Sequence, residues 1–509
     1  MKSISSKISF SAVLLSLSLA VILALAGCKQ TLEPSQTIAV LVTDESTAVI
    51  LEPSSTPVEI QAPSTPDPGP QPTATPLGRP QYNLAAELDY FNQRIVVDET
   101  ILIPHPSQNV LDELVLVVPP NAWFQVFIIQ EMFWDENYAI DDYILDGIRL
   151  TIPLDQPWNP GEPKELMIRY TLNLPQQNAR EGYGPSPFGY TTAQTNLVDW
   201  YPMVPPYQEE VGWVIHDPWI FGEYLVYPTA DFEVSLNLNN PGLVVAASSP
   251  AAIEGDLYQY SLTKARNFVF SISPNYLVLE GEVNGTRVYG YIFPGYSIPG
   301  EAAFKATLES LSLYADLFGP YYQPSLTMVQ ADFNHGMEYE GLYFQSRGFF
   351  DTYTGNQESY LITIAVHETA HQWWYGQVAN DQALEPWLDE SLCTFSELVY
   401  YEQLYPQSVD WWWATRINYY EPSGQINRSI YGFQEYVDQY LAYRDATYLQ
   451  GAKFLVRLRD VMGEDLFFKF LSDYVARYQD KIVSRQDFFS LLGDYVSGDL
   501  PWLGEYFGE

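Results

Sequence analysis

Hydrophobic and polar residues alternate along much of the first half of the chain, which predicts a β-rich N-terminal domain over residues 81–288. A period of two places every second side chain on one face of a strand, and β-branched runs bounded by turn residues are typical of strands. The predicted strands are residues 94–103, 113–118, 145–152, 165–174, 232–238, 243–248, 258–265, 268–273 and 276–283. We therefore expect an antiparallel β domain of the saddle or sandwich type.

From residue 289 to residue 509 the apolar positions recur every three or four residues, a spacing that indicates helices. Two short stretches, residues 325–332 and 336–345, still have the character of strands. The predicted helices are residues 301–317, 360–374, 386–401, 447–462, 466–478 and 485–496. A small sheet combined with these helices makes the second domain α/β and mostly helical, so the chain is multidomain.

Residues 1–28 have the pattern of a targeting signal, with a short basic start and a long apolar run. The run ends in Leu25-Ala26-Gly27-Cys28, which resembles the lipobox of bacterial lipoproteins. That resemblance implies cleavage before Cys28 and an extracytoplasmic protein that is lipid-anchored to the bacterial cell membrane through this cysteine. Ordinary secretion and an uncleaved membrane helix are the alternatives. Residues 29–80 are rich in Pro, Thr and Ser and predict a disordered tether.

The net charge of the chain limits the classes of molecule that it can bind. With 24 Lys and Arg against 63 Asp and Glu, the formal net charge is −39, which excludes nucleic acid as a favoured partner. The membrane is expected as a partner only through the lipid anchor at Cys28. The other cysteine, Cys393, could bind a metal as a thiolate, but its apolar neighbours Leu392 and Phe395 favour a place in the core.

The strongest chemical signal is His367-Glu368-Thr369-Ala370-His371, an H-E-x-x-H pattern inside an apolar stretch without Gly or Pro. On a helix, residues four apart share a face, so the two imidazoles can bind one metal ion, and Glu368 lies beside it as a general base. Glu390, after eighteen intervening residues, supplies the acid that completes a two-histidine, one-carboxylate Zn²⁺ site, one zinc per chain. The alternative is a pair of buried histidines that bind nothing, which five histidines in 509 residues make improbable.

Two other segments carry candidate chemistry. Glu338 and Glu340 alternate on a strand-like segment, which places both carboxylates on one face, where Glu338 could receive the protonated amine of a peptide. A solvated strand face with two ordinary acids is an equally good interpretation. Tyr448 could stabilise an oxyanion near the zinc. Because the chain has 39 tyrosines, the spacing by itself does not select it.

Together these motifs resemble the gluzincin aminopeptidases, the family of aminopeptidase N and leukotriene hydrolase. The resemblance covers about residues 81–509 and includes H-E-x-x-H, the W-L-D-E at residues 387–390, Met337-Glu338 of a G-x-M-E-N strand, and Tyr448-Leu449-Gln450-Gly451-Ala452 of a Y-x-K-G-A segment. It implies a β saddle followed by a thermolysin-like catalytic domain. It assigns zinc to His367, His371 and Glu390, the general base to Glu368, oxyanion support to Tyr448, and substrate binding to Glu338 with Gly336 and Met337. Glu397 would support a histidine ligand, and Gln194 corresponds loosely to a residue that contacts the substrate amine.

The chain departs from the family pattern at three points. His335 replaces the first glycine and Tyr339 the asparagine of G-x-M-E-N, and Gln450 replaces the usual lysine. The chain also ends about sixty residues after Tyr448, so we expect a member without the family's large C-terminal helical domain. The resulting hypothesis is a cell-surface zinc aminopeptidase that removes N-terminal residues from peptides. The alternatives are a thermolysin-like zinc endopeptidase and a catalytically silent surface binding protein.

Overall fold

The computed structural model describes residues 38–39, 78–135, 138–177, 187–498 and 500–508. The predicted signal peptide with Cys28, and the predicted tether apart from residues 38–39 and 78–80, lie outside the described residues. Within the described ranges, no helix combines the length and the apolar character needed to cross a membrane.

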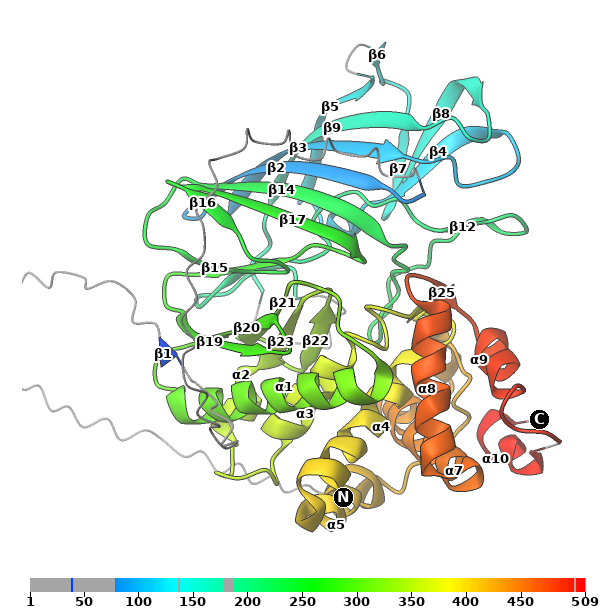
Figure 1. Cartoon of the computed structure of the whole chain (residues 1–509). Helices are drawn as coiled ribbons and strands as arrows, with labels where there is room; N and C mark the ends of the chain where they lie inside the picture. The colour runs from blue at the N-terminus through cyan, green and yellow to red at the C-terminus, as the bar shows by residue number, and fades with distance from the viewer. Residues whose placement is uncertain (1–37, 40–77, 136–137, 178–186, 499, 509) are drawn as a thin grey trace, which may run out of the picture. The chain divides into compact units, whose positions relative to one another are not determined.

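The N-terminal half is built on a large twisted sheet at the top of Figure 1. Among the described residues it has eight strands in the order β16-β17-β14-β2-β3-β9-β5-β6. All neighbouring pairs are antiparallel except β14 with β2, which are parallel. The strands are β2 (Gln81–Asp89), β3 (Arg94–Ile103), β5 (Phe127–Trp134), β6 (Tyr138–Ala139), β9 (Lys164–Asn173), β14 (Ala230–Leu238), β16 (Ala252–Glu254) and β17 (Leu257–Ala265).

Smaller antiparallel sheets complete this half. Their strands, in sheet order, are β10 (Gly189–Tyr190), β11 (Thr195–Leu197), β18 (Phe270–Ser273) and β15 (Val244–Ala247), then β4 (Leu111–Val117), β8 (Arg149–Trp158) and β7 (Ile144–Asp146), then β12 (Tyr207–Gln208) and β13 (Gly212–Trp213). The expected antiparallel β domain is confirmed, with β14 and β2 as a parallel exception. β2, β5 and β20 (Thr286–Ile292) are absent from the predicted strands; β2 contains Ala-Ala-Glu, which has little strand preference.

The second half contains a mixed sheet below the β domain (Figure 1). Within the described ranges its order is β1-β19-β20-β21-β23-β22, with β20, β21 and β23 parallel and β22 antiparallel at the edge. The bounds are β1 (Ile38–Ala39), β19 (Leu277–Val283), β20 (Thr286–Ile292), β21 (Ser325–Ala331), β22 (Gly336–Tyr339) and β23 (Leu342–Ser346). This sheet takes in β19, which lies before the predicted domain boundary at residue 288.

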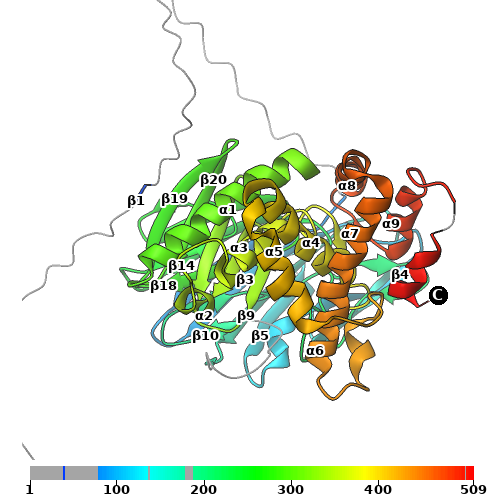
Figure 2. The same cartoon turned by 90° about the horizontal axis from the view of Figure 1, so that it is seen from below.

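The helices lie on the side of that sheet away from the β domain (Figures 1 and 2). The α-helices are α1 (Ser297–Phe318), α2 (Arg347–Asp351), α3 (Tyr360–Ala370), α4 (Trp387–Leu404), α5 (Val409–Trp412), α6 (Gln439–Arg444), α7 (Gly451–Met462), α8 (Glu464–Tyr478), α9 (Arg485–Leu492) and α10 (Gly504–Phe507). A two-stranded pair, β24 (Ala379–Asn380) with β25 (Ile482–Val483), links the start of α4 to the end of α8. The expected α/β, mostly helical second domain is confirmed.

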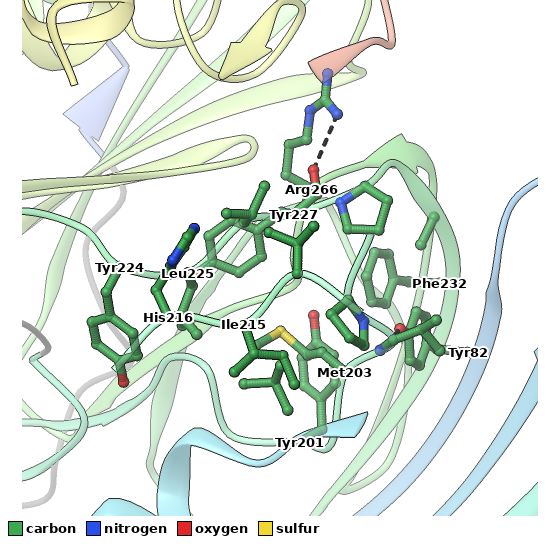
Figure 3. Close-up of a pocket in the computed structure, with 17 residues that line it drawn as sticks. Tyr82, Tyr201, Met203, Ile215, His216, Tyr224, Leu225, Tyr227, Phe232 and Arg266 are labelled. Carbon is green, nitrogen blue, oxygen red and sulfur yellow. Dashed lines mark hydrogen bonds between the residues drawn. The ribbon is translucent and has the colours of Figure 1, made fainter. Parts of the chain in front are cut away.

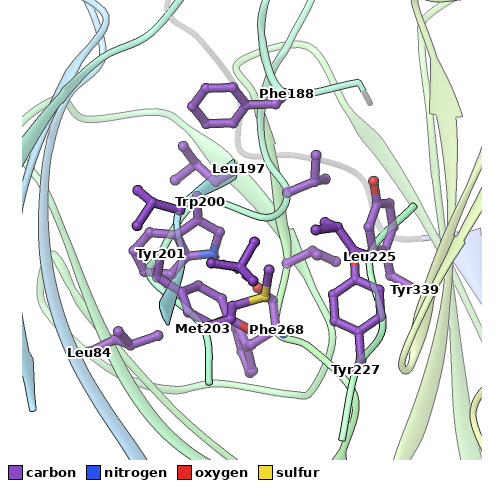
Figure 4. Packing of buried hydrophobic residues seen from close by; sticks show 14 of the residues in the cluster. Leu84, Phe188, Leu197, Trp200, Tyr201, Met203, Leu225, Tyr227, Phe268 and Tyr339 are labelled. Carbon is purple, nitrogen blue, oxygen red and sulfur yellow. Dashed lines mark hydrogen bonds between the residues drawn. The ribbon is translucent and has the colours of Figure 1, made fainter. Parts of the chain in front are cut away.

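One hydrophobic cluster extends from the β domain into the second half, and a separate cluster fills the space between the helices of the second half. Trp200 and Tyr201, from the aromatic segment between strands, are fully buried beside Phe268 (Figure 4). The indole of Trp200 donates a hydrogen bond to the main-chain oxygen of Phe268 at 2.9 Å. The same cluster continues to Tyr339 at the end of β22, so the β domain packs directly against the sheet edge that borders the site.

Candidate active site

Helix α3 carries the H-E-x-x-H segment through the core. Ser359 caps its N-terminus by accepting a hydrogen bond from the main-chain nitrogen of Leu361 at 3.2 Å. His367 and Glu368 lie in its last turn, and His371 follows directly as the C-terminal cap. All three side chains are buried. The two imidazole rings, one helical turn apart, have centroids 4.9 Å from each other.

Glu390 completes a set of donors that fits zinc. It lies in the first turn of α4, which packs against α3. Its Oε2 is 3.1 Å from Nε2 of His367 and 3.6 Å from Nε2 of His371, and the three ligand atoms lie within 4.8 Å of one another. Two imidazole nitrogens and one carboxylate oxygen, all on one side of an open cavity, are the donor set of a catalytic zinc site with a free position.

In each imidazole, the nitrogen that faces away from Glu390 lies within hydrogen-bond distance of a carboxylate oxygen. Nδ1 of His367 lies 2.8 Å from Oε1 of Glu397, and Nδ1 of His371 lies 2.6 Å from Oδ1 of Asp389. Such contacts fix the ring orientation and direct Nε2 toward the metal. The structure thus places Glu397 where the family resemblance implied, and it gives Asp389 the same role for the other histidine.

Glu397 is itself anchored by a cation. Arg416 donates to both oxygens of Glu397, at 2.9 and 2.8 Å, and the indole of Trp412 donates at 2.9 Å. Although burial acts in the opposite direction, Arg416 and His367 hold the pKa of Glu397 below its usual value. The carboxylate therefore stays ionised beside its histidine. Arg416 comes from a π-helical segment, η3 (Trp413–Ile417), a feature often found next to functional sites.

Glu368 faces the cavity as a base should. Burial raises its pKa to about 7, and its Oε2 has no hydrogen-bond partner among the described residues. The backbone of Gly336, in the edge strand β22, lies directly against this carboxylate: a methyl group on Gly336 would be 2.6 Å from Cδ of Glu368. Gly336 therefore lines the site mainly by leaving room for the base.

This close approach predicts the effect of Gly336→Ala. The added methyl must displace the end of the Glu368 side chain, which is cheap for folding but moves the base, and a shift of about 1 Å in catalytic geometry costs about 100-fold in rate. We expect kcat to fall about 100-fold with little change in the melting temperature. Gly348→Ala is the matched control, because its methyl would meet nothing closer than 3.4 Å. Equal kcat values for the two variants would contradict this role of Gly336.

Glu338 and Glu340 do not act together. Glu338 lines the cavity, and its Oε2 is 3.9 Å from Nε2 of His371. Glu340 lies beyond the end of β22, where it accepts hydrogen bonds from Gln323 at 3.1 Å and from the main-chain nitrogen of Arg266 at 3.3 Å. The expectation that both carboxylates share one face is wrong, because β22 ends at Tyr339 and the chain turns there. Of the two, only Glu338 borders the cavity.

Glu223 is a cavity carboxylate that the sequence analysis did not single out. It follows Gly222 in an irregular segment of the β domain and lines the same cavity as Glu338. Burial and the neighbouring Glu390 and Asp389 raise its pKa to about 8. Burial likewise raises the pKa of Glu338 well above its usual range, although His371 acts against it and Glu223 adds to it. Two carboxylates so placed favour a cation between them.

Tyr448 reaches the metal ligands from a second π-helical segment, η6 (Asp445–Gln450). Its hydroxyl donates a hydrogen bond to Oε1 of Glu390, and its ring stacks on that of His367 with centroids 5.9 Å apart. Burial and Glu390 raise the pKa of the phenol well above its usual range, so the hydroxyl keeps its proton. Gly451 allows this segment to approach α4, since a methyl there would be 2.6 Å from Cβ of Ser391.

Two other residues lie away from the cavity. Cys393 is buried behind His371, with its sulfur 3.8 Å from Oδ1 of Asp389. It could complete a second cluster with His371 and Asp389, but Nδ1 of His371 is already held by Asp389 and this cluster faces the core. Gln194 is fully buried, donates to Asn196 and Ser271, and is not among the described residues that line the cavity.

The cavity has a volume of about 280 Å³. Met337 lines it beside Gly336 and Glu338, so all three of the predicted substrate-binding residues border it. Aromatic rings make up much of the rest of its wall: Tyr190, Phe221, Phe333, Phe349, Tyr360, Tyr440 and Tyr443. Arg416 and Arg444 are the cationic side chains in its lining, within the described ranges, and each is already paired with a carboxylate, Glu397 and Asp445 respectively.

Comparison with known protein families identifies a domain in the second half of the chain. Residues 302–506 match the family model described as the peptidase family M1 domain. The chain carries a peptidase family M1 domain. This segment contains all three predicted zinc ligands, Glu368 and Tyr448, and the similar M1 peptidase of solved structure from Deinococcus radiodurans is described as a zinc metallopeptidase. Zinc is thus the metal that the family implies for this site.

Two individual proteins, both aminopeptidases, are similar to parts of this chain. Over 289 residues the chain is 27% identical to aminopeptidase M1-B of Oryza sativa subsp. japonica, covering 52% of this chain and 33% of the relative. It is 26% identical over 238 residues to endoplasmic reticulum aminopeptidase 2 of Homo sapiens, covering 42% of this chain and 24% of the relative. The chain thus spans about a third or less of the length of these relatives.

A solved structure matches over most of the chain. The M1 zinc metallopeptidase of Deinococcus radiodurans superposes with a TM-score of 0.61 at 16% identity, covering 82% of this chain and 91% of that one. At this level of identity the match establishes a shared fold. The architecture described above, in which a β domain is followed by a mostly helical domain, is the fold that the two proteins share.

Proposed function

We propose that the protein is a zinc aminopeptidase that removes N-terminal residues from peptides. The observation that carries this proposal is the pair of cavity carboxylates, Glu338 and Glu223, beside the predicted zinc ligands. Oε2 of Glu223 has no hydrogen-bond partner among the described residues. Two such groups cannot both ionise in a buried site without a compensating cation. The protonated α-amine of a peptide supplies that charge and places the first peptide bond next to the metal ligands.

His367, His371 and Glu390 would hold the zinc, which when bound polarises the scissile carbonyl and acidifies water. Glu368 accepts a proton from the attacking water and delivers it to the departing amine. The Tyr448 hydroxyl, already directed at the ligand set, donates a hydrogen bond to the negative charge that develops on the carbonyl oxygen. Glu338 and Glu223 fix the substrate by its amine, so that the cut falls after the first residue.

Glu338→Gln and Glu223→Gln test this amine site. Each change removes a negative charge and keeps the shape, so we expect kcat/KM on free-amine peptides to fall about 10- to 100-fold, chiefly through KM. Glu210→Gln, at an exposed position of the β domain that contains Glu223, is the control and should leave kcat/KM unchanged. If both cavity variants retain the wild-type KM, the amine of the substrate is not bound by these carboxylates.

We also propose that the enzyme works outside the cell, anchored through a lipid on Cys28. The support is the sequence Leu25-Ala26-Gly27-Cys28 after an apolar run, followed by a Pro-, Thr- and Ser-rich segment long enough to hold the enzyme off the membrane. Expressed in a bacterium, the wild-type protein should partition with the membrane fraction. Cys28→Ser should move it to the soluble fraction or leave its signal uncleaved. Cys393→Ala, which removes the other thiol, should stay in the membrane fraction; membrane association of the Cys28→Ser protein with a processed signal would refute the lipid anchor.

A further inference from the structure

A buried glutamine connects the predicted metal ligands to the predicted amine site. Gln382 lies between β24 and α4 and is 3% exposed. Its side-chain nitrogen donates to Oδ2 of Asp389 at 2.6 Å and to Oε1 of Glu338 at 3.2 Å. A single amide group therefore bridges two carboxylates that come from different elements, α4 and the edge strand β22.

Each of these carboxylates uses its other oxygen toward the site. Oδ1 of Asp389 is 2.6 Å from Nδ1 of His371, and Oε2 of Glu338 is 3.9 Å from Nε2 of the same histidine. His371, Asp389, Gln382 and Glu338 thus form a closed ring of contacts. Because Gln382 holds Oε1 of Glu338, the free oxygen Oε2 is turned toward the cavity at a set distance from His371.

The chemistry of this position requires a neutral donor. An amide nitrogen has two hydrogens and can donate to both carboxylates at once. A glutamate at this position would add a third negative charge, and an apolar side chain of the same length would leave Oδ2 of Asp389 and Oε1 of Glu338 without this donor in a buried place. Gln382 also lines a small cavity behind Glu338 that includes Glu223, so it borders both acids of the amine site.

We propose that Gln382 is a positioning residue that sets the distance between the substrate's α-amine and the metal ligands. It acts through Glu338 and does not itself touch the reacting atoms. The consequence is a fixed register in which the enzyme removes one residue at a time. This inference rests on the proposed aminopeptidase function.

Gln377 provides a matched control. It is a second buried glutamine five residues earlier, 2% exposed, whose side-chain nitrogen donates to the main-chain oxygen of Pro320 at 3.1 Å. It does not line the cavity. Replacement by methionine at either position removes one buried amide and keeps the length of the side chain. The cost to folding should be larger at Gln382, which donates to two carboxylates, than at Gln377, which donates to one main-chain oxygen, and only the change at Gln382 affects Glu338.

The experiment compares the wild type with Gln382→Met, Gln382→Glu and Gln377→Met. KM and kcat are measured on a dipeptide amide with a free amine. Calorimetry measures binding of an amino acid amide and of its N-acetylated form, and zinc content and melting temperature are recorded. We expect Gln382→Met to raise KM at least 10-fold, to weaken binding of the free-amine ligand by a similar factor, and to retain zinc. Gln382→Glu should do the same or more, and Gln377→Met should leave KM and ligand binding within twofold of the wild type.

Three results would overturn the inference. If both methionine variants change KM equally, the role of Gln382 is only structural. If Gln382→Glu and Gln382→Met bind the free-amine ligand as the wild type does, Glu338 is not positioned by this amide. If the wild type itself does not distinguish the free amine from the acetylated form, the proposed function fails and this inference fails with it. Should Gln382→Met not fold, Gln382→Glu, which keeps the size of the side chain but replaces the donor by a carboxylate, still decides between these outcomes.

Discussion

Replacement of Glu368 by glutamine will nearly abolish peptide hydrolysis while leaving zinc in place. Glutamine keeps the shape of the side chain but cannot accept a proton from water, and loss of general base catalysis costs about 100- to 10,000-fold in rate. The three predicted zinc ligands and the carboxylates that orient the histidines, Glu397 and Asp389, are untouched by this change. Measurements of kcat and of zinc content per chain check both parts of the prediction.

Glu301→Gln, on the exposed side of α1, is the control for this experiment and should keep the wild-type kcat. A Glu368→Gln enzyme with zinc bound and kcat within a few-fold of the wild type would contradict the assignment of Glu368 as the base. Loss of zinc together with activity would show instead that Glu368 belongs to the metal site.

Replacement of Arg266 by methionine will lower the free energy of unfolding by about 4 kcal/mol. Arg266 comes from the β domain and is 2% exposed. Its guanidinium donates to the main-chain oxygens of Gly376, Gln377 and Lys481, at 3.0, 3.3 and 3.1 Å, all in the second half of the chain. A fourth hydrogen bond, to the main-chain oxygen of Tyr227 at 3.1 Å, is drawn in Figure 3. Methionine would remove all four hydrogen bonds: the oxygens of Gln377 and Lys481 keep the main-chain donors of Asp480 and Ala379, at 2.8 and 3.0 Å, whereas those of Gly376 and Tyr227 lose their donor.

Arg169→Met is the control for the loss of an arginine in itself. Arg169 lies on β9 of the same domain, half exposed, with Nε 3.4 Å from Asp98 in an ion pair of the surface type. Such pairs contribute about 0 to 1 kcal/mol, so its variant should unfold close to the wild-type midpoint. Denaturant unfolding of both variants measures the difference, and equal midpoints would show that Arg266 does not hold the two halves together.

The zinc ligands could be predicted from the sequence because local rules place them. His367 and His371 share a face of α3 through helical spacing, and Glu390 falls in the first turn of the next long helix after a proline. The β domain and the helices after residue 289 could be predicted for the same reason, since alternation and helical spacing are local. β2 was not predicted because its alanines and glutamate have a weak preference for strands. Its strand conformation depends on hydrogen bonding to its neighbours β3 and β14.

The rest of the site depends on tertiary contacts. Glu223 is a single acid in an irregular segment, and only the packing of the β domain against β22 brings it to the cavity. Arg416 lies on a π-helical turn, whose spacing differs from the helical period that the sequence pattern reveals, and Tyr448, on another such turn, was predicted through the family resemblance and not through its spacing. Gln382 belongs to a polar loop with no motif. Glu340 was misplaced because the turn after Tyr339 breaks the alternation of the strand.

The most direct test of the account is hydrolysis of a panel of short peptides with free and with acetylated N-termini, each with and without a chelator. We predict that only the free-amine peptides are cleaved, one residue at a time from the N-terminus, and that the chelator abolishes cleavage until zinc is restored. Internal cleavage of acetylated peptides at a comparable rate would contradict it and would identify a zinc endopeptidase. Absence of cleavage of either set by the zinc-loaded protein would contradict catalysis itself.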